Sequence, residues 1–104
     1  MKDSIRSPEY RQVLAKLVQM RTEAGLTQRE LARKLAREYS FVWRIETGKR
    51  RLDVVEFYWV CKALGRNAAD VYRELFQAIT VQQNKVSSRR IRAKQGASRK
   101  KRHD

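Results

Sequence analysis

Four side chains near the middle of the chain fall on one face of a short helical segment. Val42 and Ile45 are three residues apart, so turning both inward leaves the opposite face to Tyr39, Ser40, Trp43 and Arg44. An arginine can donate two hydrogen bonds to guanine O6 and N7, and a serine hydroxyl can bond almost any base. A tyrosine offers a hydroxyl, or its ring against a thymine methyl. Arg44 alone implies a particular base.

The side chains that enzymes use as catalysts or metal ligands are scarce. Cys61 is the only cysteine and lies on an apolar helical face, and His103 is the only histidine, next to the C-terminal residue. Neither a zinc ligand set nor a nucleophile with its base can be assembled from them. Glu46 has no nearby partner for acid-base catalysis. We therefore expect a protein that is not an enzyme, without metal or cofactor, in which Cys61 is a small core residue.

The charge predicts a polyanionic partner. The 104 residues include 25 Lys plus Arg and 11 Asp plus Glu, a formal net charge of +14, far from what solubility alone requires. Residues 85–104 hold nine basic residues and one acidic residue, but only two larger aliphatic residues, Val86 and Ile91. Such a segment cannot offset its ordering entropy by burial, so we predict a disordered basic tail. The tail is either a phosphate-seeking arm, which its charge favours, or a solubilising extension.

Length and patterning predict one domain. We expect an N-terminal extension over residues 1–6, a domain over residues 7–80 and the tail over residues 81–104. No run of 18 apolar residues occurs, and the N-terminus lacks the apolar stretch of a secretory signal. We expect an intracellular protein, cytoplasmic and associated with the nucleoid, with no membrane partner.

Two well-marked helices open the domain. Ser7-Pro8 supplies a capping serine and a proline at the first helical position, and Gly25 ends this helix. The segment 27–30 (TQRE) is a capping box that starts a second helix, which runs to about Leu35.

Three further helices complete the domain. The short third helix ends at Thr47-Gly48, where glycine can adopt a left-handed conformation. A capping box at 53–56 starts a fourth helix with an apolar stripe, Val54, Phe57, Tyr58, Cys61 and Leu64. Asn67 with Asp70 starts a fifth helix, which carries Val71, Leu75 and Ile79 at four-residue spacing. The fold class predicted is all-α, a compact bundle of five helices with a disordered basic C-terminal tail.

The turn at 36–38 joins the second and third helices too closely for antiparallel stacking, which predicts a helix-turn-helix. The chain resembles the phage repressor and Cro-type helix-turn-helix family, also called the xenobiotic-response-element (XRE) type. The resemblance rests on residues 25–35 (GLTQRELARKL), Ser40, residues 44–50 (RIETGKR) and residues 63–65 (ALG). It covers roughly residues 8–76, and the combination is far more specific than any one of its pieces.

The resemblance implies that the third helix enters the major groove of DNA, with its N-terminal residues at the base edges. Tyr39, Ser40 and Arg44 match the positions of the family's base contacts. Trp43 lies beside them and either contacts DNA, packs sideways into the domain or meets a partner. The alternative for the exposed Tyr39 and Arg44 is a solvated helix face.

Other positions match the family's supporting residues. Gln28, at the first position of the second helix, matches a phosphate contact. Lys49, Arg50 and Arg51 would lie along the DNA backbone, or else form a solvated charge run. The resemblance also implies a structural salt bridge between Arg21 and Glu46.

The turn departs from the family pattern at three positions. Ala36 stands where glycine is usual, so the turn must accommodate a possible left-handed residue without glycine's freedom. Arg37 replaces an apolar residue, and Glu38 replaces a serine or threonine cap. Glu38 also brings a negative charge near the phosphates and could accept a hydrogen bond from cytosine N4.

We therefore expect a sequence-specific regulator of transcription, a repressor, that binds double-stranded DNA as a homodimer on a palindromic operator. The dimer seam is expected on the fifth helix at Val71, Leu75 and Ile79, with Tyr72 or Phe76 as further candidates. The alternative is a non-enzymatic adaptor or antitoxin-type interaction protein, with a protein partner, or an RNA-binding protein. It would use the same fold and the basic tail.

Overall fold

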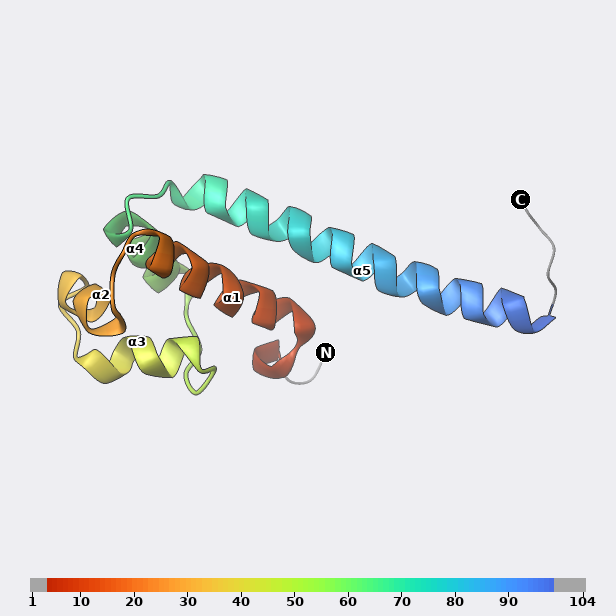
Figure 1. Ribbon diagram of the computed structural model, residues 1–104, viewed down its shortest axis with the longest axis horizontal. Coiled ribbons are helices and arrows are strands. Elements are labelled where there is room, and N and C mark those ends of the chain that lie inside the picture. Colours follow the sequence, from red (N-terminus) through yellow and green to blue (C-terminus); the bar gives the residue numbers. More distant parts are fainter. Residues whose placement is uncertain (1–3, 99–104) are drawn as a thin grey trace.

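Five α-helices follow one another in the computed structural model, which describes residues 4–98, with side chains described as far as residue 85. After a short 3-10 helix, η1 (Ser4–Arg6), they are α1 (Pro8–Glu23), α2 (Gln28–Lys34), α3 (Tyr39–Glu46), α4 (Val54–Ala63) and α5 (Ala68–Ser98). No strand occurs among the described residues, and Figure 1 shows α1 to α4 gathered around one end of the long α5. The predicted all-α fold of five helices is confirmed.

The helices begin where the capping residues predicted. The Ser7 hydroxyl accepts a hydrogen bond from the Tyr10 N–H at the start of α1. Thr27 and Asp53 each form both halves of a capping box at the starts of α2 and α4. At the start of α5, the Asn67 side chain accepts from the Asp70 N–H. Each bond satisfies a backbone donor that the first turn leaves unpaired.

The turn after α2 is built without glycine. Ala36 has a φ of +57°, whereas the equivalent positions after α1, α3 and α4 are glycines with a φ of 73° to 77°. The Ala36 N–H donates to the Arg33 carbonyl at 3.0 Å, and the Arg37 N–H donates to the Ala32 carbonyl at 2.9 Å. These two bonds form a Schellman motif, which holds Ala36 in the left-handed region despite its Cβ. The predicted left-handed residue is present.

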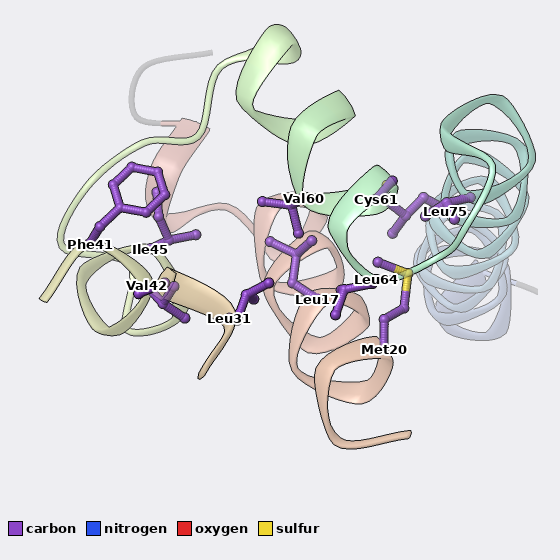
Figure 2. Close-up of a cluster of buried hydrophobic side chains, with 12 residues drawn as sticks. Leu17, Met20, Leu31, Phe41, Val42, Ile45, Val60, Cys61, Leu64 and Leu75 are labelled. Atoms are coloured by element: carbon purple, nitrogen blue, oxygen red, sulfur yellow. The ribbon is translucent and has the colours of Figure 1, made fainter. Parts of the chain in front are cut away.

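One hydrophobic core joins all five helices (Figure 2). Its buried members are Leu17, Met20, Leu31, Ala32, Phe41, Val42, Ile45, Val60, Cys61, Leu64, Val71 and Leu75. The second and third helices contribute Leu31, Ala32, Phe41, Val42 and Ile45 from one side. The core therefore fixes α3 by its inner face and leaves its outer face to solvent.

One expectation about the later helices is corrected. Val54 and Tyr58 of the predicted α4 stripe are exposed, whereas Cys61 and Leu64 of the same stripe are buried together with Val60. α5 continues as a helix to Ser98, into the predicted tail over residues 81–104. The remaining tail residues, 99–104, lie outside the described part of the chain.

Candidate nucleic-acid interface

The outer face of α3 carries the side chains predicted to read bases. Phe41, Val42 and Ile45 are buried against the rest of the domain, so the residues between them turn outward. Tyr39 is 46% exposed and Trp43 is 41% exposed, while Ser40 is half-buried. The structure thus brings the predicted residues together on one accessible face.

Arg29 extends this face onto α2, which sequence spacing did not reveal. Its guanidinium carbon lies 4.8 Å from the centre of the Tyr39 ring, within the range of a cation–π contact. The pair joins two helices across the turn, so it depends on how α2 and α3 cross. No periodicity within either helix could have indicated it.

Arg44 lies on the same face and is held loosely. Its guanidinium is 3.5 Å from the Glu38 carboxylate, and the two side chains are 43% and 66% exposed. The Arg44 Nε is buried and has no hydrogen-bond partner among the described residues. Glu38 makes no side-chain cap bond at the start of α3, so its carboxylate is available to the arginine. An exposed pair of this kind contributes little stability and can open readily.

Glu46 joins the end of α1 to the motif. Arg21 Nε donates to Glu46 at 2.7 Å, and Arg21 Nη2 donates to the other carboxylate oxygen at 3.0 Å. The salt bridge that the resemblance implied is therefore present, and its side chains are 13% and 6% exposed. The hydrogen bond that Arg21 donates to Glu46 raises the pKa of Arg21. Gln28, expected at a phosphate, donates its amide N–H to Glu46 at 2.8 Å in the free chain.

The three neighbouring cations in the loop after α3 have different environments. Lys49 and Arg51 are exposed, whereas Arg50 donates two hydrogen bonds to Glu56, at 3.0 and 2.9 Å. The paired arginine holds the pKa of the buried Glu56 carboxyl below its usual range. Arg50 also lies 4.9 Å from the Phe41 ring centre. The sequence predicts the same role for all three cations, as one run of charge. In the structure, Arg50 differs from the other two because it is bound to Glu56 within the protein.

Arg37 completes a cluster around Phe41. Its guanidinium carbon lies 3.9 Å from the ring centre, and its Nη1 lies 3.9 Å from the Glu56 carboxylate. An arginine stem can cover apolar surface while its charged end stays near solvent. This explains how Arg37 occupies a position where an apolar residue is usual.

The dimer seam expected on α5 needs correction. Val71 is fully buried and Leu75 is 5% exposed, both within the core of the single chain, and Ile79 is half-buried. They face α1 and α4, so a second chain cannot reach the first two. The outward face of α5 instead presents Tyr72 and Phe76, which are 52% and 55% exposed, with ring centres 4.8 Å apart. An open hollow of about 600 Å³ runs along this face.

Metal-ligating side chains are dispersed in the described part of the chain. No group of three or more His, Cys, Asp and Glu side chains there could hold a metal ion. Cys61 is a core residue, as expected, and burial raises the pKa of its thiol to about 11. No helix among residues 4–98 combines the length and apolar character needed to span a bilayer.

Comparisons with known proteins agree with this geometry. The helix-turn-helix domain family model matches residues 12–75, and no curated protein matches the chain. An XRE-family like protein from Pseudomonas syringae is 37% identical, with a TM-score of 0.66, over 72% of this chain and 94% of that one. The clp gene regulator ClgR from Corynebacterium glutamicum is 26% identical, with a TM-score of 0.65, over 83% of this chain and 92% of that one.

Proposed function

This chain belongs to the XRE-type helix-turn-helix family, and from that premise we propose that it is a sequence-specific repressor of transcription. In this proposal α3 enters the major groove and reads bases with Tyr39, Ser40, Trp43 and Arg44. The similar ClgR is described as a gene regulator, which supports the class. A regulator of this kind needs no enzymatic activity, and it acts where the DNA is, in the cytoplasm and at the nucleoid.

The accessible outer face of α3 is the observation that carries the proposal. Two aromatic rings there, Tyr39 and Trp43, are each more than 40% exposed, although the same helix buries three apolar side chains. Large exposed aromatic side chains are enriched where another molecule binds. Arg44 adds donors that match guanine, and its bond to Glu38 is weak enough to be exchanged for a base.

Phosphate contacts would hold this face against the groove. We assign them to Lys49 and Arg51, which are exposed beside the end of α3, and to Gln28, whose amide is fixed by Glu46. Arg50 is assigned to the protein itself, because both of its terminal nitrogens bond to Glu56. Phosphate contacts fix register and orientation without reading sequence.

A homodimer would double the reading surface. We place its seam on the outward face of α5, around Tyr72 and Phe76, because these rings are exposed while Val71 and Leu75 are not. Twofold symmetry of the protein would be mirrored by a palindromic operator, with half-sites about 34 to 36 Å apart on one side of the duplex.

A binding selection over randomised duplexes tests the proposal. We expect a palindromic consensus whose half-sites are one helical turn apart. A flat preference among duplexes, together with tighter binding to structured RNA, would instead support the alternative of an RNA-binding adaptor.

A further inference from the structure

The outward face of α4 is apolar although nothing covers it among the described residues. Val55, Tyr58 and Trp59 are each 51% exposed, and with Lys62 they recur at the spacing of neighbours on a single helix face. The inner face of the same helix buries Glu56, Val60 and Cys61. A helix that is apolar on both faces is usually covered on both, so this face is suited to a partner.

A hollow lies at one edge of this face. It has a volume of about 460 Å³ and is lined by the end of α2 and by α4, through Lys34, Leu35, Trp59, Lys62 and Ala63. Leu35, Trp59 and Ala63 make it apolar, and the two lysines supply its charge. No carboxylate is among these lining residues.

We propose that this surface, formed by α4 and the end of α2, binds an acidic segment of a partner protein. One large apolar side chain of that segment would pack against Trp59, and its carboxylates would pair with Lys34 and Lys62. Exposed tryptophans are frequent energetic centres of protein interfaces, and complementary charge around them steers association. The proposal does not depend on DNA binding.

Charge argues against the two occupants that the chain itself could supply. A second copy in a twofold contact would bring the two lysines of one copy close to the two of the other, because such an interface uses the same small patch on both partners. The C-terminal segment, residues 85–104, carries nine basic residues and one acidic residue, so the two lysines would repel it. An acidic partner meets neither obstacle.

The position of the surface leaves the DNA-reading face free. In Figure 1, α4 lies beside the start of α5, whereas α3 lies apart from that point, at the lower edge of the view. A protein bound at α4 could therefore be carried to a site that α3 occupies. Single-stranded nucleic acid is a rival ligand, since bases stack on aromatic rings. The aliphatic lining at Leu35 and Ala63 favours a protein side chain over a base.

Peptide titration of the full chain tests this inference. The probes are a synthetic peptide rich in Asp and Glu with one central Leu, the same peptide with Ala in place of Leu, a Lys-rich version with Leu, and oligothymidylate. The signals are the two tryptophan indole N–H resonances, assigned with Trp59→Phe. We expect the acidic Leu peptide to shift the Trp59 signal and to leave the Trp43 signal in place. It should shift the Trp59 signal at a lower concentration than any of the other three probes.

Variants make the test specific. Lys34→Glu with Lys62→Glu should weaken binding of the acidic Leu peptide at least about tenfold, and Trp59→Ala by a similar factor. Lys85→Glu, a matched charge reversal at an exposed residue of α5, should leave it unchanged. The two lysines are surface residues, so their variants test the idea even if Trp59→Ala does not fold. The proposal would be overturned if oligothymidylate or the Lys-rich peptide shifted the Trp59 signal at the same or a lower concentration than the acidic Leu peptide, or if the acidic Leu peptide left that signal in place.

Discussion

Two groups of cations surround α3, and they differ in what their acidic neighbours do. Arg21 donates two hydrogen bonds to the Glu46 carboxylate, and Arg50 donates two to the Glu56 carboxylate. Arg44 has only a 3.5 Å contact to an exposed Glu38, and Lys49 and Arg51 are exposed. Both groups consist of arginine and lysine side chains, so residue type does not distinguish them. The difference is that a buried carboxylate holds the first group within the protein, whereas the second group is free to contact a ligand.

The two carboxylate-bound arginines, Arg21 and Arg50, hold in place the backbone that carries Arg44, Lys49 and Arg51. Arg21 ties the end of α1 to the last residue of α3 through Glu46, and Arg50 ties the following loop to α4 through Glu56. Two parallel hydrogen bonds between guanidinium and carboxylate fix orientation as well as distance. Arg44 and the exposed loop cations therefore start from a defined position, and any DNA contact they make costs less ordering entropy.

Breaking the Arg21 pair should have the largest effect. Arg21→Ala leaves Glu46, which is 6% exposed, without its cation, and an uncompensated buried charge of this kind costs about 3 kcal/mol. We expect that loss in the free energy of unfolding, measured by urea denaturation at neutral pH. Arg51→Ala is the matched control and should change stability by less than about 0.5 kcal/mol. Similar losses for both variants would erase the distinction between the two groups.

Removing Arg44 should affect sequence reading rather than folding. We expect Arg44→Ala to weaken binding to the preferred duplex by about 1 to 3 kcal/mol and to relax the preference at one base pair per half-site. Urea unfolding should show little change, because the side chain is 43% exposed and its ion pair is weak. Competition with random duplexes provides the check. An equal loss on random DNA would move Arg44 into the class of phosphate contacts.

The Glu56 pair should make stability depend on pH in the acidic range. Its pKa is lowered from an ordinary 4.5, first by the hydrogen bond from Arg50. A lowered folded-state pKa stabilises the fold above the ordinary value, and this stability is lost as the pH falls through the lowered value. Glu56→Gln should therefore cost about 1 kcal/mol near pH 7, a figure reduced for the solvent access of Arg50. Unfolding curves of variant and parent should converge at acidic pH, and a constant difference at all pH values would contradict this.

Local signals in the sequence predicted most of the fold. The caps at Ser7, Thr27 and Asp53 are satisfied within three residues of each cap, so no knowledge of distant contacts was required. The left-handed residue at Ala36 was predictable for the same reason. The same holds at the start of α5, where the Asn67 side chain accepts from the Asp70 N–H three residues later.

The candidate site was predictable only in part. The family motif located Arg21, Glu46 and the outer face of α3 by position. The contact of Arg29 with Tyr39 and the burial of Val71 depend on how separate helices cross, and the pairing of Arg50 with Glu56 depends on how the loop after α3 folds against α4. Apolar spacing could not tell which side of α5 meets α1, since both Val71 and Tyr72 belong to plausible stripes. Tertiary packing determines which of these side chains are buried and which are exposed.

The smallest expected effect concerns the exposed loop cations, whose removal should change DNA binding but not stability. Lys49→Ala with Arg51→Ala should weaken binding to every duplex by the same factor and leave the preferred sequence unchanged, because phosphate contacts carry no base information. Log affinity falls with log salt by about 0.9 per phosphate neutralised, so losing two contacts should reduce the slope by about 1.8. Stability should not change, whereas Arg50→Ala, between the same two residues, should destabilise the fold by leaving Glu56 unpaired. A salt titration with the selected operator and a random duplex measures the slope. The opposite result would be an unchanged salt slope in the double variant and a lower slope in Arg50→Ala without loss of stability. In that case Arg50 would be the phosphate contact, and the assignment of the two groups would be reversed.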